Sequence, residues 1–531
     1  MNVPMKRRSF LGGIGSAACA GALGLGWVAA TTEQARAFER LDRRERERLA
    51  DLAMDMARRA GAAYADLRIC RNSWQEVTVR ERRLDWSESG VLVGFGLRVL
   101  IDGAWGFAGS ATVDEASLRA AVASASESAA AIRRLGAVPV VLETLQSHRD
   151  DWTMPMAEDP FAVALGDKVD LLTRVNDAAL KGGASFISAS ADAAKEEKFF
   201  ASSVGSLIEQ RRVRVAPSFD VTVIDRASGR FGGRHSLAQP RAAGWEYVRG
   251  LNLVAEAEEA AQQAREKLAA KPVEPGRYDL VIDPTNLWLT LHESVGHSTE
   301  LDRALGWEAN YAGTSFVTPE LRGRLQYGSA LMTVLADRTQ AGGLATVGYD
   351  DDGVKSDSAS FAIIRNGIFE NFQMAIGQAH LIGAERSNGC AFADGPTTFP
   401  LQRMPNISLQ PNPDPTSLDD LIGGVENGIL IVGSGSWSID QQRYNFQFGG
   451  QLFYEIRNGK RGAMLRDVAY QAQSQSFWNA MDAVGDRSTW QLCGTFNCGK
   501  GEPGQGAPVS HGAPAARFRN INVLNTERGD L

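Results

Sequence analysis

The sequence predicts an α+β protein of two domains, an N-terminal domain of helices on an antiparallel sheet followed by a β-rich C-terminal domain. At 531 residues the chain is long enough for two hydrophobic cores. Residues 38–271 alternate between helical periodicity and the two-residue period of strands, whereas residues 272–531 are mostly strand-like. The stretch 271–276, with prolines at 272 and 275, marks the boundary between them.

Residues 1–37 are expected to form a targeting segment. The paired Arg7 and Arg8 precede a Gly/Ala-rich run over 11–30, and 35–37 read A-R-A before Phe38. This pattern is typical of a twin-arginine signal, which is read by a receptor and cleaved after an A-x-A sequence. The prediction is an exported, periplasmic protein. The alternative is an uncleaved segment that anchors the chain in the membrane.

The N-terminal domain is expected to contain four helices and several strands but no catalytic residue. The helices are predicted at 39–60, 113–135, 161–180 and 245–270, and the strands at 65–70, 75–80, 91–101 and 197–225. Asp102-Gly103 predicts a hairpin turn. Gly94-Phe95-Gly96 lies inside a strand with no helix after it, so we interpret these glycines as structural and not as a nucleotide loop.

In the C-terminal domain, strands are predicted at 345–348, 361–365, 368–374, 452–457 and 461–465. Asn366-Gly367 and Asn458-Gly459 predict type I′ hairpins between neighbouring pairs. The acidic run 350–352 before Gly353 is interpreted as a turn and not as a cation site.

Composition argues against two classes of partner. The formal net charge is −7 and no basic patch is evident, which argues against nucleic acid. After the first thirty residues, no apolar run is long enough to span a bilayer. Beyond residue 37 the chain keeps four cysteines, too few for a disulfide-stapled scaffold of this size.

The stretch 292–297, H-E-S-V-G-H, contains the residue types of a catalytic zinc site. Residues five apart on a regular α-helix are rotated by about 140°, so His292 and His297 can share one ion only if the helix is distorted. A π-bulge supplies the extra residue, and Gly296 is expected to make that distortion easier. We therefore predict a helix from about residue 286 that widens over 294–296.

A third ligand is needed, because a catalytic zinc usually has three protein ligands and an open position. The candidates are Cys498, Cys493, His380, His511 and Glu300. Cys498 is favoured because it lies in a glycine-bearing loop and Lys500 would help to keep its thiolate ionised. The alternative is a Cys493–Cys498 disulfide in an oxidising compartment.

Motifs along nearly the whole chain resemble the TldD/PmbA family, on its metal-bearing TldD side. The motifs are Y-A-D at 64–66, G-F-G-L-R at 94–98, H-E-S-V-G-H at 292–297, D-D-G at 351–353, R-M-P-N at 403–406 and C-G-K at 498–500. The resemblance implies a zinc peptidase with His292, His297 and Cys498 as ligands and Glu293 as the catalytic carboxylate. It also implies a dimer with an enclosed cavity that admits small or unfolded peptides, formed with a second copy or a metal-free PmbA/TldE-type relative.

The expected mechanism is hydrolysis of peptides by a metal-activated water, with Glu293 as general base. Arg403 and His511 are candidates to contact the substrate, and Glu300 is a candidate to hold one of the histidines. The export signal and the sequence 298–302 depart from familiar members of the family. Two alternatives stay open, namely a zinc-clipped scaffold in the maturation of a peptide or cofactor, and another periplasmic metal-dependent amide hydrolase.

Overall fold

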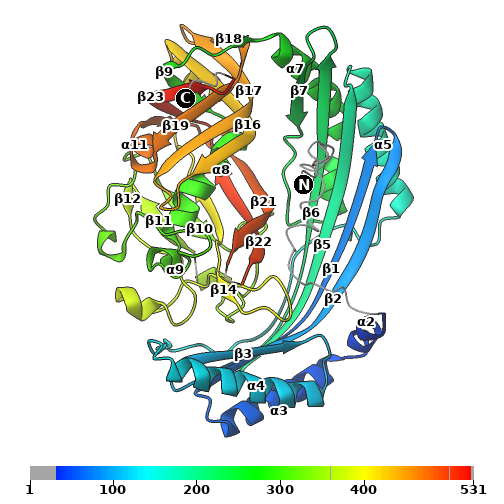
Figure 1. Cartoon of the computed structure of the whole chain (residues 1–531), viewed down its shortest axis with the longest axis vertical. Coiled ribbons are helices and arrows are strands. Elements are labelled where there is room, and N and C mark those ends of the chain that lie inside the picture. The colour runs from blue at the N-terminus through cyan, green and yellow to red at the C-terminus, as the bar shows by residue number, and fades with distance from the viewer. Residues whose placement is uncertain (1–31, 359, 502, 528–531) are drawn as a thin grey trace, which may run out of the picture.

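The computed structural model describes residues 32–358, 360–501 and 503–527. The predicted twin-arginine motif and its apolar run therefore lie outside the described residues. The described chain is α+β, with a long curved sheet on one side and a β-rich half on the other (Figure 1).

The N-terminal half is built on a seven-stranded sheet in the order β3-β2-β1-β5-β6-β4, with β7 paired to β6. Its neighbouring strands are antiparallel, apart from the parallel pair β4 and β6. The strands are β1 (Tyr64–Arg80), β2 (Arg83–Ile101), β3 (Ala104–Ser110), β4 (Arg149–Thr153), β5 (Phe186–Ser202), β6 (Leu207–Asp225) and β7 (Arg230–His235).

Two groups of helices cover this sheet. Helices α5 (Leu165–Lys181) and α7 (Leu253–Ala269), with the short α6 (Trp245–Gly250), bury one core against the face that points away from the C-terminal half (Figure 1). Helices α3 (Arg43–Arg59) and α4 (Glu115–Arg134) bury a second core at the other end of the sheet, and α2 (Thr32–Glu39) precedes them. The opposite face of the long strands is thus left to meet the C-terminal half.

The C-terminal half contains an eight-stranded sheet in which β16, β9, β23, β19 and β17 pair in sequence and β17 returns to β16, which closes a barrel. Its strands are β8 (Lys271–Pro272), β9 (Gly276–Ile282), β16 (Asn427–Ile439), β17 (Asn445–Arg457), β18 (Lys460–Arg466), β19 (Val468–Gln473), β20 (Met481–Val484) and β23 (Ala516–Asn525). Strand β8 lies at the predicted domain boundary and pairs in parallel with β18, so the boundary residues belong to this second sheet.

Smaller elements surround the barrel. A four-stranded sheet contains β10 (Val334–Asp337), β11 (Phe361–Arg365), β12 (Ile368–Phe369) and β15 (Asn406–Leu409), and the strands β13 (Ala391–Phe392) and β14 (Leu401–Gln402) form a pair. A further pair consists of β21 (Gln491–Lys500) and β22 (Gln505–Ala513). The helices are α8 (Pro284–Leu291), α9 (Leu301–Ala304), α10 (Leu418–Gly423) and α11 (Ser474–Asn479).

The predicted hairpins are confirmed. Asn366-Gly367, Asn458-Gly459 and Asp102-Gly103 all have positive φ at both central residues and join directly paired strands. Several predicted element boundaries are wrong. Residues 65–70 and 75–80 belong to the single strand β1, the segment 197–225 spans parts of β5 and β6, and the helix at 245–270 is two helices. Residues 345–348 form no strand, and 368–374 contribute only the two residues of β12.

Buried charges join the two halves. Arg98 on β2 donates to Asp66 at 2.6 Å and to Asp352 of the C-terminal half at 2.8 Å. Lys198 on β5 pairs with Asp351 at 2.5 Å. Gly353 has φ +78°, and Asp350 accepts backbone N–H groups from residues 352 and 354, so the acidic run is a turn as predicted. The turn presents Asp351 and Asp352 to cations of the long sheet.

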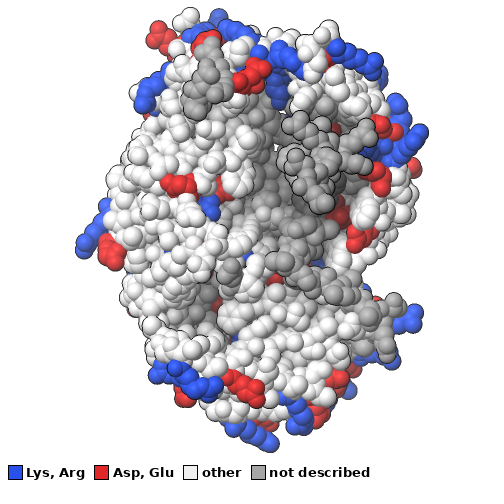
Figure 2. All heavy atoms as spheres, in the orientation of Figure 1, with Lys and Arg blue, Asp and Glu red and all other residues white. Residues whose placement is uncertain are grey.

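On the face drawn in Figure 2, basic and acidic side chains are interspersed around the outer rim, and a hollow separates the two halves. Among the described residues, no helix combines the length and the apolar character needed to cross a membrane.

Candidate metal centre

Helix α8 directly precedes the two histidines predicted to bind a metal, and its start is strongly specified by the sequence. The Asp283 side chain accepts from the Thr285 N–H, and Pro284 occupies the first turn, where its missing N–H costs nothing. All eight residues of α8 are buried between β16 and the β21–β22 pair. The residues that follow α8 are therefore held on a rigid, enclosed element.

The predicted distortion of this helix is confirmed. Residues His292–Gly296 form a π-helical turn, in which the His297 N–H donates to the His292 carbonyl, and a 3₁₀ turn follows over His297–Thr299. The five-residue step brings both imidazoles to one side, with ring centroids 4.7 Å apart.

Gly296 serves this turn in a different way from the one expected. Its φ of −54° is an ordinary helical value that any residue adopts, so glycine's conformational freedom is not what the turn requires. A Cβ at this position would lie 2.8 Å from Met404 Sδ. Gly296 is needed because Met404 packs against its backbone.

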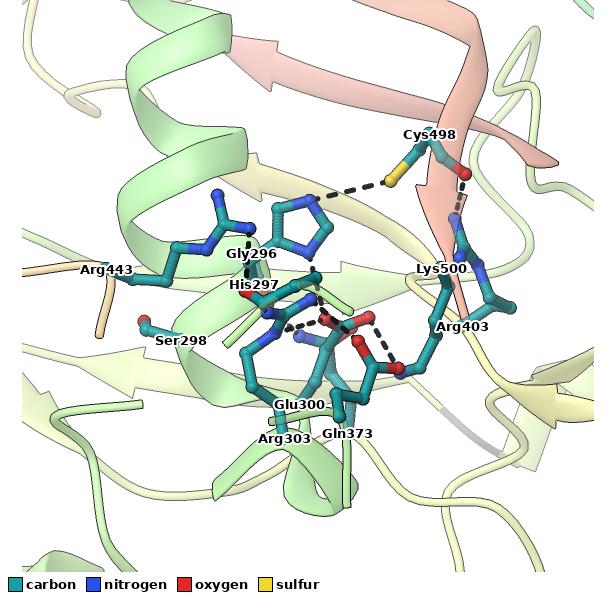
Figure 3. Close-up of polar contacts among 12 residues, drawn as sticks. Gly296, His297, Ser298, Glu300, Arg303, Gln373, Arg403, Arg443, Cys498 and Lys500 are labelled. Carbon is teal, nitrogen blue, oxygen red and sulfur yellow. Dashed lines mark hydrogen bonds and ion pairs between the residues drawn. The ribbon is translucent and has the colours of Figure 1, made fainter. Parts of the chain in front are cut away.

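The structure brings His292, His297 and Cys498 together. One ligand atom from each lies within 4.8 Å of the others, and all three residues are buried. Cys498 comes from β21, just after a register shift against β22, and its Sγ lies 3.6 Å from His297 Nε2 (Figure 3). Among the described residues, this is the one group of three or more His, Cys, Asp or Glu side chains with the spacing of a metal site.

Glu300 holds His297, as the sequence suggested. His297 Nδ1 donates to Glu300 Oε2 at 2.9 Å, which leaves the Nε2 lone pair facing Cys498. Arg303 and Lys500 contact the same carboxylate at 3.2 Å and 3.3 Å (Figure 3). Burial alone would raise the pKa of Glu300, but Lys500 and His297 outweigh it and hold that pKa well below its usual range.

His511 holds His292 in an equivalent way. His511 Nδ1 lies 3.1 Å from the Ile407 carbonyl, which only accepts, so this nitrogen carries the proton. His511 Nε2 therefore has a lone pair and accepts from His292 Nδ1 at 2.7 Å. Consequently His292 Nε2 is the nitrogen left with a lone pair for an ion.

The donor set fits a zinc-like cation. Burial lowers the pKa of both His292 and His297, which favours the neutral imidazoles that ligate metals. Burial also raises the pKa of Cys498 to about 11, with Arg403 the first positive charge that opposes the rise. Two neutral imidazoles and a buried thiol suit Zn²⁺, which binds thiolate and imidazole together.

Glu293 is buried beside the ligands and paired with Arg443. Its Oε2 lies 2.5 Å from Arg443 Nη1, and its charge acts on both His292 and Cys498. Arg443 lies between β16 and β17, in a left-handed conformation with φ +63°. Arg443 could not be predicted from the sequence, because nothing local distinguishes it from an ordinary loop arginine.

Lys500 is surrounded by three carboxylates and the Gln402 side-chain oxygen, to which its Nζ donates at 2.9 Å. Besides Glu300 it contacts Asp302 at 2.9 Å and Glu308 at 3.1 Å. Burial raises the pKa of Glu308 to about 7. The charges that act most strongly on Lys500 are therefore those of the three acids. Lys500 also lowers the pKa of Cys498, but less than Arg403 does.

Of the remaining candidate residues, Arg403 and His511 support the ligands, whereas Cys493 and His380 lie apart from them. Arg403 is buried and donates from Nη2 to the Cys498 carbonyl, and His511 lies behind His292. Cys493 is a free thiol that donates to the Pro284 carbonyl at 3.7 Å, and Cys498 is also free. His380 is exposed at the short turn Ala379–Ile382.

Comparison with known proteins assigns the chain to the same family that its sequence motifs resemble. Three models of one family match: PmbA/TldA metallopeptidase domain 1 over residues 65–129, the central domain over 158–268 and the C-terminal domain over 275–525. A metalloprotease of Methanothermobacter thermautotrophicus is 28% identical over 481 residues, which cover 90% of this chain and 98% of the relative.

Two further similarities extend this result. A zinc metalloprotease TldD homolog of Saccharolobus solfataricus is 26% identical over 252 residues, which cover 47% of this chain and 52% of the relative. The crystal structure of TldE from Thermococcus kodakarensis has the same fold, with a TM-score of 0.69 and 15% identity over 90% of this chain and all of the other. The chain belongs to the TldD/PmbA family of metallopeptidases.

Proposed function

We propose that this protein is a zinc-dependent peptidase that hydrolyses short or unfolded peptides. The observation that carries the proposal is the convergence of His292, His297 and Cys498, whose ligand atoms lie within 4.8 Å of one another. The zinc metalloprotease named among the relatives supports the choice of metal. A cation held by these three residues would supply Lewis-acid chemistry, acidifying a water molecule and polarising the scissile carbonyl.

The protein's own residues provide the remaining chemistry. Glu293 follows His292 directly, and its carboxylate can accept a proton from the attacking water and return it to the leaving amine. Arg443 holds that carboxylate in place through Nη1. Glu300 and His511 fix the orientation of the two imidazoles. Arg403 and His511, proposed as substrate contacts, are better placed to hold the Cys498 backbone and His292.

A catalytic zinc site is favoured over a structural zinc site. A structural zinc site is normally closed by four protein ligands. Among the described residues, neither Cys493 nor His380 approaches the centre, since the first faces Pro284 and the second is exposed. Three protein donors leave a coordination position for water or substrate.

The decisive experiment is Glu293→Gln, with the exposed Glu320→Gln as a matched control. We expect Glu293→Gln to retain about one zinc per chain, measured by mass spectrometry, and to lose at least about 100-fold in peptide hydrolysis. Glu320→Gln should behave as the wild type. A Glu293→Gln protein that still cleaves a peptide library at the wild-type rate contradicts the assigned role.

We further propose that the active form is a dimer, either of two copies or with a metal-free PmbA/TldE-type relative. The similarity to TldE supports a relative of the same fold as partner. Native mass spectrometry of the complex purified from its source distinguishes the two compositions. A purely monomeric protein with full activity contradicts the proposal.

Export by the twin-arginine route also remains a proposal, supported by Arg7, Arg8 and the 35–37 sequence. Replacing both arginines with lysine should leave the protein in the cytoplasm and uncleaved, as measured by fractionation and N-terminal sequencing. Unchanged export of that variant contradicts this route.

A further inference from the structure

A cavity lies outside the metal centre, between the long sheet and the β21–β22 pair. Its volume is about 290 Å³. The floor comes from β1, β2, β5 and β6, and the opposite wall includes Phe496, Asn497 and Pro508. Because Asn497 directly precedes Cys498, the cavity lies beside the strand that carries the thiol of the metal centre.

One end of the cavity is acidic. Glu76 on β1 is directly opposite Glu88 on β2 and Asp192 on β5, so three carboxylates form a row on one face of the sheet. Like charges placed side by side across strands repel each other. Glu76 is only 5% exposed, and its Oε1 has no hydrogen-bond partner among the described residues. Burial, together with Glu88, raises the pKa of Glu76.

The other end is basic. Arg214 on β6 is 7% exposed, and its Nη1 has no hydrogen-bond partner among the described residues. Its Nη2 is 3.7 Å from Glu196, which Arg212 already binds at 3.0 Å, so Arg214 has only a shared counter-ion. Burial lowers the pKa of Arg214 to about 9, with Arg212 adding to the effect.

The two ends are a short peptide's length apart. Arg214 is opposite Ala194 on β5, which is two residues along from Asp192, the partner of Glu76. Strand spacing and rise per residue place the Cα atoms of Glu76 and Arg214 about 12 Å apart, before their side chains extend into the cavity.

The space between the ends suits a peptide. Asn72 lines it and has an Oδ1 with no hydrogen-bond partner among the described residues, which leaves an acceptor for a peptide N–H. Trp74, Leu92, Phe392 and Phe496 supply apolar walls. Three unsatisfied polar atoms in one cavity indicate a ligand that satisfies them, because buried polar groups are rarely left without partners.

We propose that this cavity binds a short zwitterionic peptide, with its free amine on Glu76 and its free carboxylate on Arg214. A dipeptide or tripeptide has both charges at suitable separation, and the aromatic walls favour apolar side chains. This site goes beyond the proposed peptidase function, because binding here requires neither the metal nor Glu293.

The test is calorimetry with leucyl-leucine, N-acetyl-leucyl-leucine and leucyl-leucinamide. Acetylation should weaken binding to the wild type about 10- to 100-fold, as should amidation, since each removes one charged hydrogen bond. In Glu76→Gln, acetylation should have little further effect, and in Arg214→Gln amidation should have little further effect. Mass spectrometry of the same solutions shows whether the peptide stays intact, so loss of binding is distinguished from loss of hydrolysis.

Matched controls come from the opposite face of the same strands. Glu197 on β5 and Arg211 on β6 pair with each other at 3.8 Å outside the cavity. The variants Glu197→Gln and Arg211→Gln should therefore bind the peptide as the wild type does. Absence of binding to the wild type overturns the proposal. Equal binding by Glu76→Gln, Arg214→Gln and the wild type also overturns it, because the peptide then binds elsewhere.

Hydrogen exchange on the wild type keeps the test decisive if a variant does not fold. Leucyl-leucine should protect backbone amides in 72–76, 192–196, 496–500 and 505–508. Protection confined to 292–300 would place the peptide at the metal centre and overturn the proposal.

Discussion

The imidazoles of His292 and His511 are joined by a hydrogen bond of 2.7 Å, although 219 residues separate them in the chain. His511 in turn donates to the Ile407 carbonyl, and Trp288 stacks on its ring. The two metal-binding histidines are thus oriented by different groups, a carboxylate for His297 and a neutral imidazole for His292. Each partner leaves one ring nitrogen for the ion.

His511 is expected to strengthen zinc binding by orienting His292. His511→Leu should weaken zinc binding about 10- to 100-fold, because it removes the acceptor that orients His292. His511→Gln should bind zinc more nearly as the wild type does, since its amide can accept from His292 and donate to Ile407. Competition with a chelating dye measures both affinities. Equal affinities for Leu and Gln at this position would show that the hydrogen bond does not matter.

Arg443 is expected to matter for catalysis and not for metal binding. Arg443→Met removes the cation that holds Glu293, so the rate of peptide hydrolysis should fall about 10- to 100-fold while zinc content stays at the wild-type level. Arg487→Met is the control, because Arg487 lies at an exposed turn against Trp490. Loss of zinc from Arg443→Met would contradict this division of roles.

The contact between Gly296 and Met404 is expected to leave no room for a Cβ at position 296. Gly296→Ala places a Cβ 2.8 Å from Met404 Sδ and should destabilise the protein by about 1–3 kcal/mol, as overpacking does. Urea unfolding measures this free energy. The cost should shrink in a Met404→Ala background. Gly166→Ala, which meets open space, should show no such loss, and equal costs with and without Met404 would refute the packing explanation.

Arg98 is expected to stabilise the contact between the two halves. Arg98→Met leaves Asp66 and Asp352 buried without their shared cation, and this should cost about 3–5 kcal/mol of unfolding free energy. Arg58→Met, which removes an exposed pair with Asp55, should cost less than about 1 kcal/mol. A similar small loss for both variants would show that the buried network contributes little.

Lys168 should make stability rise with pH. It is 1% exposed, and burial lowers its pKa to about 8 in the folded chain, against 10.5 for an unperturbed lysine. Between these values the unfolded chain holds more protons, so the wild type should gain about 3 kcal/mol as pH rises from 8 to 10.5. Lys168→Met should lack this gain. Parallel curves of unfolding free energy against pH for the two proteins would contradict the prediction.

Features that depend on neighbours in the chain were predictable from the sequence. The widened turn at 292–296 follows from two histidines five residues apart, and the Asn-Gly and Asp-Gly hairpins follow from residues that tolerate positive φ. The α+β class follows from the order of helical and strand periodicities. The ligand Cys498 was favoured by its local glycine and lysine, but resemblance to a family was needed to choose it over a disulfide.

Strand lengths were less predictable. Arg71 and Ser73 fall at the apolar positions of β1 between Ile69 and Val77, which made one strand look like two. The strand continues because β2 and β5 pair with it on both sides along nearly its whole length, which the local pattern does not reveal.

The sequence by itself determined the metal-binding helix, the tight turns and the fold class, since hydrogen bonds within a few residues specify them. Only the tertiary structure decided that His511 supports His292, that Arg443 reaches Glu293, and that Glu76 and Arg214 face one cavity. These pairs are separated by 219, 150 and more than a hundred residues, respectively. Burial and packing bring them together, and no spacing along the chain encodes which distant strands will meet.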